Sequence, residues 1–120
     1  MKMDADVYKL RRKVINVLYD LKRDGFDLPR IEVRIVKDCK DAMAYAYIGK
    51  NIIHVDMYWL LKFKDTKLLV MHEIGHAVFG LGRIEGCTLM DCNRDWEWHS
   101  DTSEENIEIF RKYYNNYKNK

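Results

Sequence analysis

The chain has 120 residues, which suits one domain with a single modest hydrophobic core. Its 21 basic residues nearly cancel its 19 acidic ones, leaving a net charge of +2, and no basic stripe alternates with aromatic residues. A dedicated nucleic-acid-binding surface is therefore not expected. No apolar run approaches the roughly 20 residues that span a bilayer, no signal-peptide pattern is present, and three cysteines do not make a secreted disulfide framework. We expect a soluble, cytoplasmic protein without membrane insertion, and its Lys-, Glu- and Ile-rich composition also suits a thermophile.

The first half of the chain predicts one helix and a small sheet. Residues 4–23 repeat apolar side chains at three- and four-residue spacing with Lys and Arg opposite, which is the pattern of an amphipathic helix. Residues 31–36 alternate apolar and charged side chains and predict a half-buried strand. Residues 42–48 and 51–55 are two further strand candidates, joined by a short turn at Gly49-Lys50. Together these segments predict a small three-stranded sheet against which the helix packs.

The second half predicts two helices on either side of a glycine-rich loop. Residues 57–63 are apolar and aromatic enough for a short helix or a buried connector, and Asp65 or Thr66 can cap the helix that follows. The pattern breaks over residues 80–94, and a last helical pattern starts near Asp95. The candidate buried positions of this last helix are Trp96, Ser100, Ile107, Phe110 and Tyr114.

The helix after residue 65 contains the sequence His72-Glu73-Ile74-Gly75-His76 within an almost wholly apolar run. Two histidines four residues apart project from one face of a helix, which is the spacing that two imidazoles need to bind one zinc ion. Glu73 lies about 100° round the helix, where it can reach a metal-bound water without being a ligand. The five-residue pattern also occurs by chance on partly exposed helices. Burying three ionisable groups among apolar neighbours is costly, however, and Zn²⁺ would compensate that cost.

A catalytic zinc site usually has three protein ligands and a water, so a third ligand must be found. Glu97 follows His76 by 21 residues, and Asp101 lies one helical turn further on, where it could accept a hydrogen bond from a ligand histidine. The same acidic pair would also suit a solvated surface helix. His99 is the alternative third ligand. Two residues along a helix place it nearly opposite Glu97, so only one of the two can ligate the metal.

Two other metal arrangements are not expected. Metzincin peptidases carry a third histidine soon after the motif and then a methionine turn, but Gly82 occupies that histidine position here, so Met90 is ordinary packing. Cys87 and Cys92 could share a second metal with Cys39 or His99, but four good ligands are not visible. Free or packed thiols are the default interpretation, and His54 is interpreted as a structural or surface residue.

The motif His-Glu-x-x-His, followed about twenty residues later by Glu-x-x-Ser-Asp, is similar to that of the gluzincin metallopeptidases, thermolysin among them. The resemblance implies that His72, His76 and Glu97 bind Zn²⁺, with Asp101 supporting a ligand histidine and Glu73 acting as general base. The implied reaction is hydrolysis of a peptide bond by a zinc-activated water.

A domain of this size with a helix, a small sheet, an active-site helix and a glutamate helix resembles the minigluzincins, soluble relatives of membrane-embedded zinc peptidases. The resemblance implies a zincin-like α+β domain over residues 1–120, a peptide or protein substrate, and latency if residues 102–120 occupy the cleft. That segment could equally continue the last helix and pack on the core, in a monomer or in a homodimer formed through it. Residues 51–55 are the candidate strand for pairing with an extended substrate. The rival interpretation is a zinc-stabilised module that binds peptides or proteins without turnover.

Overall fold

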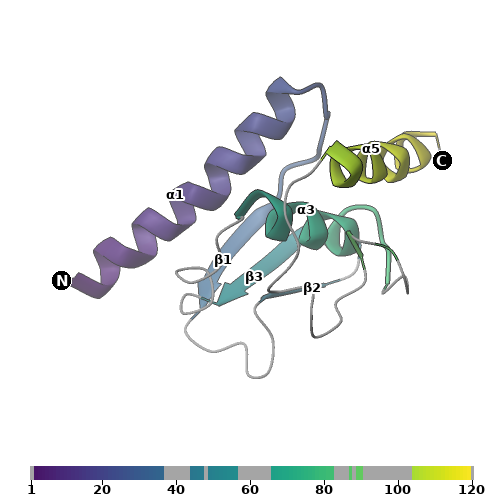
Figure 1. Ribbon diagram of the computed structural model, residues 1–120. Coiled ribbons are helices and arrows are strands. Elements are labelled where there is room, and N and C mark those ends of the chain that lie inside the picture. The colour runs from purple at the N-terminus through teal and green to yellow at the C-terminus, as the bar shows by residue number, and fades with distance from the viewer. Residues whose placement is uncertain are drawn as a thin grey trace.

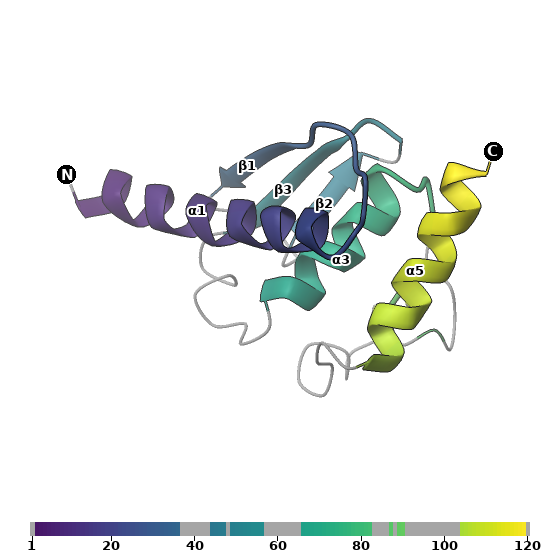
Figure 2. The same cartoon turned by 90° about the horizontal axis from the view of Figure 1, so that it is seen from above.

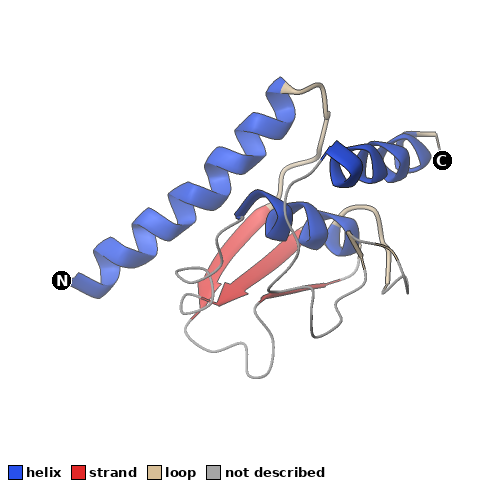
Figure 3. Cartoon of the chain, viewed as in Figure 1, coloured by secondary structure: helices blue, strands red, loops and turns tan. Residues whose placement is uncertain are grey.

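The computed structural model describes residues 2–36, 44–47, 49–56, 66–82, 87, 89–90 and 104–119. Three helices and a small sheet give the α+β class that the sequence predicts (Figures 1 and 3). The predicted segment 57–63 and the predicted start of the last helix near Asp95 lie outside the described residues. Within the described ranges, no helix is long and apolar enough to cross a membrane. The elements in chain order are α1 (Lys2–Arg23), β1 (Glu32–Val36), β2 (Ala44–Tyr47), β3 (Ile52–Asp56), α3 (Thr66–Ala77) and α5 (Glu104–Lys118).

The strands pair in the order β1-β3-β2. β1 and β3 run parallel, with Glu32 opposite Ile52, whereas β2 runs antiparallel to β3. The sheet has three strands, as the sequence predicts; only β1 and β3 are parallel in it, and β2 is a four-residue antiparallel strand at the edge. β3 lies in the centre because it is strongly apolar, and its side chains Ile53 and Val55 are fully buried.

The central place of β3 corrects one expectation, that residues 51–55 would pair with an extended substrate. Both edges of β3 already form hydrogen-bonded ladders, one with β1 and one with β2. A peptide can add only to a strand edge that is free. In the described part of the sheet, such edges remain on β1 and β2, and β2 is the one against which α3 packs.

Helix α3 lies between α1 and α5 and packs on the sheet through β2 and β3 (Figures 1 and 2). It is enclosed on several sides, and every residue from Leu68 to Gly75 is buried. Such a helix must be apolar around its whole circumference, which explains the near-continuous apolar run in the sequence. α1 contributes one stripe to the same core, as its three- and four-residue spacing predicts; its buried side chains are Leu10, Val14, Val17 and Leu21.

Helix α5 closes the other side of the core through aromatic contacts. Phe110 is fully buried, with its ring centroid 4.9 Å from that of Phe26 in an edge-on arrangement and 5.2 Å from that of Phe79. The Tyr114 hydroxyl accepts a hydrogen bond of 2.9 Å from the Asp27 amide. In the described residues 104–119, the C-terminal segment is therefore mostly helical and packs on the core.

Replacing Phe110 by alanine should lower the free energy of unfolding by about 3–5 kcal/mol, since it removes a fully buried aromatic ring and leaves a cavity. Urea denaturation followed by circular dichroism measures the change. Tyr19→Ala is the matched control, because Tyr19 is 67% exposed and its loss should change stability by no more than about 0.5 kcal/mol. Equal denaturation midpoints for the two variants would show that α5 is not part of the cooperative core.

Candidate metal centre

Helix α3 brings His72 and His76 together as the motif spacing predicts. Their ring centroids lie 4.6 Å apart with the ring planes nearly perpendicular, and the two Nε2 atoms are 3.1 Å apart. Two nitrogen ligands that bind one tetrahedral zinc at about 2.0–2.1 Å are separated by about 3.3 Å. The spacing of the two Nε2 atoms therefore fits two ligands of a shared metal ion.

The opposite nitrogens of both rings are held by backbone carbonyls. His72 Nδ1 lies 2.7 Å from the Leu89 carbonyl oxygen, and His76 Nδ1 lies 2.6 Å from that of Leu81. A carbonyl oxygen can only accept, so each Nδ1 carries a proton and donates it. The Nε2 atoms of the two rings then face each other across 3.1 Å. Histidines that bind zinc usually donate the N–H of the other ring nitrogen to a carbonyl or carboxylate, so this donor set fits Zn²⁺.

The turn that ends α3 sets the position of the Leu81 carbonyl. Gly80 has a φ of 74°, in the left-handed region that glycine adopts most readily. The Leu81 amide then donates a hydrogen bond of 2.8 Å back to the Gly75 carbonyl, six residues earlier in the chain. The carbonyl of Leu81 is thereby fixed where His76 Nδ1 can donate to it. The turn that ends α3 therefore also orients the imidazole ring of His76.

Residues 89–90 pack directly on α3 beside the first histidine. Leu89 and Met90 are both buried, and a Cβ added to Gly75 would lie 2.6 Å from Met90 Sδ. The glycine inside the motif therefore leaves room for the methionine side chain. Met90 acts as packing, in agreement with the sequence interpretation, and its contact with α3 keeps the neighbouring Leu89 carbonyl within reach of His72.

The β2–β3 turn also binds the end of α3. The Gly49 amide donates a hydrogen bond of 3.2 Å to the His76 carbonyl, and the Asn51 amide donates one of 3.2 Å to the Ala77 carbonyl. Both turn residues have positive φ, 73° at Gly49 and 58° at Asn51. Glycine and asparagine are the residues that tolerate this conformation best. These bonds satisfy helix carbonyls that would otherwise lack partners.

Glu73 lies beside the histidine pair in a buried position. Its side chain is 3% exposed, and its Oε1 is 4.0 Å from His72 Nε2. Its Oε2 accepts no hydrogen bond from the described part of the chain. Burial raises the pKa of Glu73 to about 8 and lowers the pKa of His72 to about 4. Without a metal, both groups are therefore neutral at pH 7, whereas a cation at the Nε2 atoms would favour the carboxylate.

The described residues do not include Glu97 and His99, the candidates for the third ligand, or Asp101. The sequence predictions for these three residues therefore remain predictions. Within the described ranges, no group of three or more His, Cys, Asp or Glu residues is gathered as a metal would require. Cys87 is half-buried as a free thiol, and Cys39 and Cys92 are outside the described ranges. His54 is 7% exposed in β3, which agrees with a structural role.

We expect Gly80→Ala to lower the free energy of unfolding by about 1 kcal/mol and to weaken zinc binding about tenfold. A side chain at position 80 has open space around it, so the effect comes from the positive φ and from displacement of the Leu81 carbonyl. Competition with a chromophoric zinc chelator measures the affinity. Gly82→Ala is the control, because Gly82 also has open space but no positive φ. Equal affinities of the two variants would contradict the proposed role of the helix end.

Glu73→Gln should stabilise the metal-free protein increasingly as pH rises. The unfolded chain loses the Glu73 proton near pH 4.5, whereas the folded chain retains it up to about pH 8. Folding of the wild type is therefore weakened as pH rises through this window, and glutamine removes the effect. The difference in unfolding free energy should reach about 3 kcal/mol at pH 7. Denaturation in the presence of a chelator at several pH values tests this, and a difference independent of pH would contradict it.

No family model, curated protein or solved structure matches this chain. An interpretation of function therefore depends on the motif and on the geometry of the residues around it. That geometry comprises two Nε2 atoms at ligand spacing, two imidazole rings whose Nδ1 atoms each donate to a backbone carbonyl, and a buried carboxyl group next to them.

Proposed function

We propose that the chain is a zinc-dependent metallopeptidase of the gluzincin type, similar to the minigluzincins. The observation that carries the proposal is the pair of Nε2 atoms 3.1 Å apart on His72 and His76. Both Nδ1 atoms donate to backbone carbonyls, which leaves Nε2 as the atom of each ring that would bind a metal. Glu97 is the proposed third ligand with Asp101 supporting a ligand histidine, and His99 is the alternative.

Zinc, when bound, supplies the Lewis acidity that lowers the pKa of water and polarises a peptide carbonyl. The protein's own contribution to proton transfer comes from Glu73. With Oε1 4.0 Å from His72 Nε2, its carboxylate is near enough to accept a proton from a water beside the two imidazoles. It can then deliver that proton to the leaving amine nitrogen. The apolar surroundings of α3 keep other water away from this exchange.

The proposed substrate is an extended segment of a peptide or protein. α3 packs against β2, and in the described part of the sheet β2 has a partner on one edge only. Pairing of a peptide with the outer edge of Ala44–Tyr47 would provide main-chain hydrogen bonds near the metal helix. We do not propose that removal of α5 activates the protein, because α5 contributes Phe110 to the core, where it is fully buried against Phe26 and Phe79.

A second candidate function is a zinc-stabilised module that binds a peptide or protein without turnover. The observation that favours it is burial, since His72 and Glu73 are each only 3% exposed. Structural zinc sites are closed by protein ligands, whereas catalytic sites keep one position open. The presence of Glu73 favours the enzyme, because a structural site has no use for a base.

The test combines zinc content with hydrolysis of a mixture of internally quenched peptides. Wild type should hold one zinc per chain and cleave peptides. Glu73→Gln should retain the zinc and lose about 10²–10⁴-fold in rate, because only proton transfer is removed. Glu97→Ala should weaken zinc binding, and His99→Ala is the matched comparison that should leave it unchanged.

Each result that differs from these expectations would exclude a different part of the proposed function. A wild-type cleavage rate in Glu73→Gln would rule out the proposed mechanism. Zinc binding without hydrolysis by the wild type would favour the binding module. Zinc held equally well by Glu97→Ala, but lost in His99→Ala, would move the third ligand to His99.

A further inference from the structure

A positively charged hollow lies where α1, the segment leading into β1 and the β2–β3 turn meet. It has a volume of about 640 Å³, and each of the three segments contributes one cation to its lining. These cations are Arg11 from α1, Arg30 before β1 and Lys50 in the turn, and all three are exposed. None of them is part of the candidate metal centre.

The charges around this hollow are not balanced by acids. Glu32 is the acidic residue in the lining, and its two carboxylate oxygens already accept hydrogen bonds of 3.1 and 3.3 Å from Arg34. Among the described residues, no ion pair joins Arg11, Arg30 or Lys50 to an acid. Three like charges around one hollow repel one another, so a bound anion would be stabilised there.

The number and arrangement of the cations favour phosphate over carboxylate. A carboxylate carries one negative charge and would leave most of the positive charge uncompensated. A phosphate monoester carries about −1.5 to −2 at pH 7 and offers three strong acceptor oxygens. Guanidinium groups bind two such oxygens at once, and an ammonium group adds a point charge. Cations approaching from three separate segments suit a group whose oxygens point in several directions.

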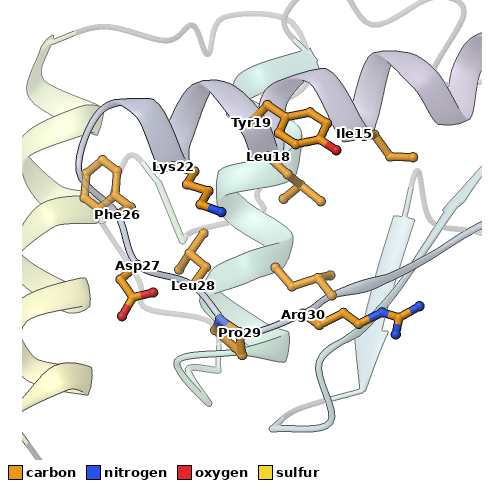
Figure 4. A pocket seen from close by; sticks show the side chains of 10 residues that line it. Ile15, Leu18, Tyr19, Lys22, Phe26, Asp27, Leu28, Pro29 and Arg30 are labelled. Atoms are coloured by element: carbon orange, nitrogen blue, oxygen red, sulfur yellow. The ribbon is translucent and has the colours of Figure 1, made fainter.

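A groove with a mixed apolar and polar lining adjoins the charged hollow. Its volume is about 410 Å³, and it shares Arg30 and Ile31 with the hollow (Figure 4). Its surface includes Leu28 and the exposed ring of Tyr19. In Figure 4 the Arg30 side chain points away from Asp27, the groove's own acid. The Asp27 carboxylate is paired with Lys118 at 2.9 Å, which lowers its pKa.

We propose that the hollow and the groove together bind a phosphate monoester with an apolar or aromatic body. The phosphate would lie among Arg11, Arg30 and Lys50, and the body would lie in the groove against Tyr19 and Leu28. This site does not depend on the proposed peptidase function. Its ligand chemistry is shared by soluble phosphate esters and by lipids with a phosphomonoester headgroup, and the experiment below separates these sources.

The probe is phenyl phosphate, with inorganic phosphate and benzoate as partial ligands, titrated into the full chain by calorimetry at constant ionic strength. Phenyl phosphate should bind more tightly than either partial ligand, because it alone carries both the dianion and the ring. Amide chemical shifts should change at residues 30–32 and 49–51. Displacement of phenyl phosphate by vesicles containing phosphatidic acid, but not by neutral vesicles, would assign the site to a lipid headgroup. Absence of displacement would assign it to a soluble ester.

Charge-removing variants test the placement of the phosphate. Arg30→Gln should weaken phenyl phosphate binding about tenfold, the loss expected for one charge-assisted contact. Arg12→Gln is the matched control, since Arg12 is an exposed arginine of α1 that lines neither cavity. Tyr19→Ala should weaken phenyl phosphate but not inorganic phosphate. Equal losses in Arg30→Gln and Arg12→Gln, benzoate binding as tight as phenyl phosphate, or no saturable binding at millimolar concentration would overturn the proposal.

Discussion

The structure depends on two hydrogen bonds from histidine side chains to backbone carbonyls, His72 to Leu89 and His76 to Leu81. These bonds fix the tautomer and the ring orientation of both imidazoles and leave their Nε2 atoms facing each other. Both carbonyls belong to residues that follow α3 in the chain, so the site requires these residues to fold back and pack on α3. The turn at Gly80 and the packing of Met90 on Gly75 both hold them there.

Without a metal, burial disfavours the charged forms of His72 and Glu73. α3 is enclosed by α1, α5 and the sheet, so desolvation raises the pKa of Glu73 and lowers that of His72. Both shifts remove charge from the metal-free protein. A divalent cation at the Nε2 atoms would reverse this balance by favouring the ionised carboxylate. The apolar core that supports the helix thus also tunes the chemistry of its polar residues.

Hydrophobic patterning predicted much of the fold, because α1 and β1 follow the periodicity of their own side chains and α3 is a near-continuous apolar run. The strand order was not predictable in the same way, since it depends on which strand is buried on both edges, and residues 51–55 were wrongly expected to have a free edge. The motif predicted which histidines meet. It could not reveal the carbonyls of Leu81 and Leu89, because every residue has a carbonyl and the sequence does not mark its direction. Glu97, His99 and Asp101 are still predicted by sequence alone.

The hydrogen bonds from Gly49 and Asn51 to the end of α3 have a consequence for how this chain can vary. Hairpin turns are usually places where a protein tolerates insertions and deletions. Here the turn length fixes which amides meet the last carbonyls of the helix that carries His76. Adding or removing one residue would shift that match and the strand register together. A short surface turn is therefore under the same length constraint as the core, and variation in chain length is expected elsewhere.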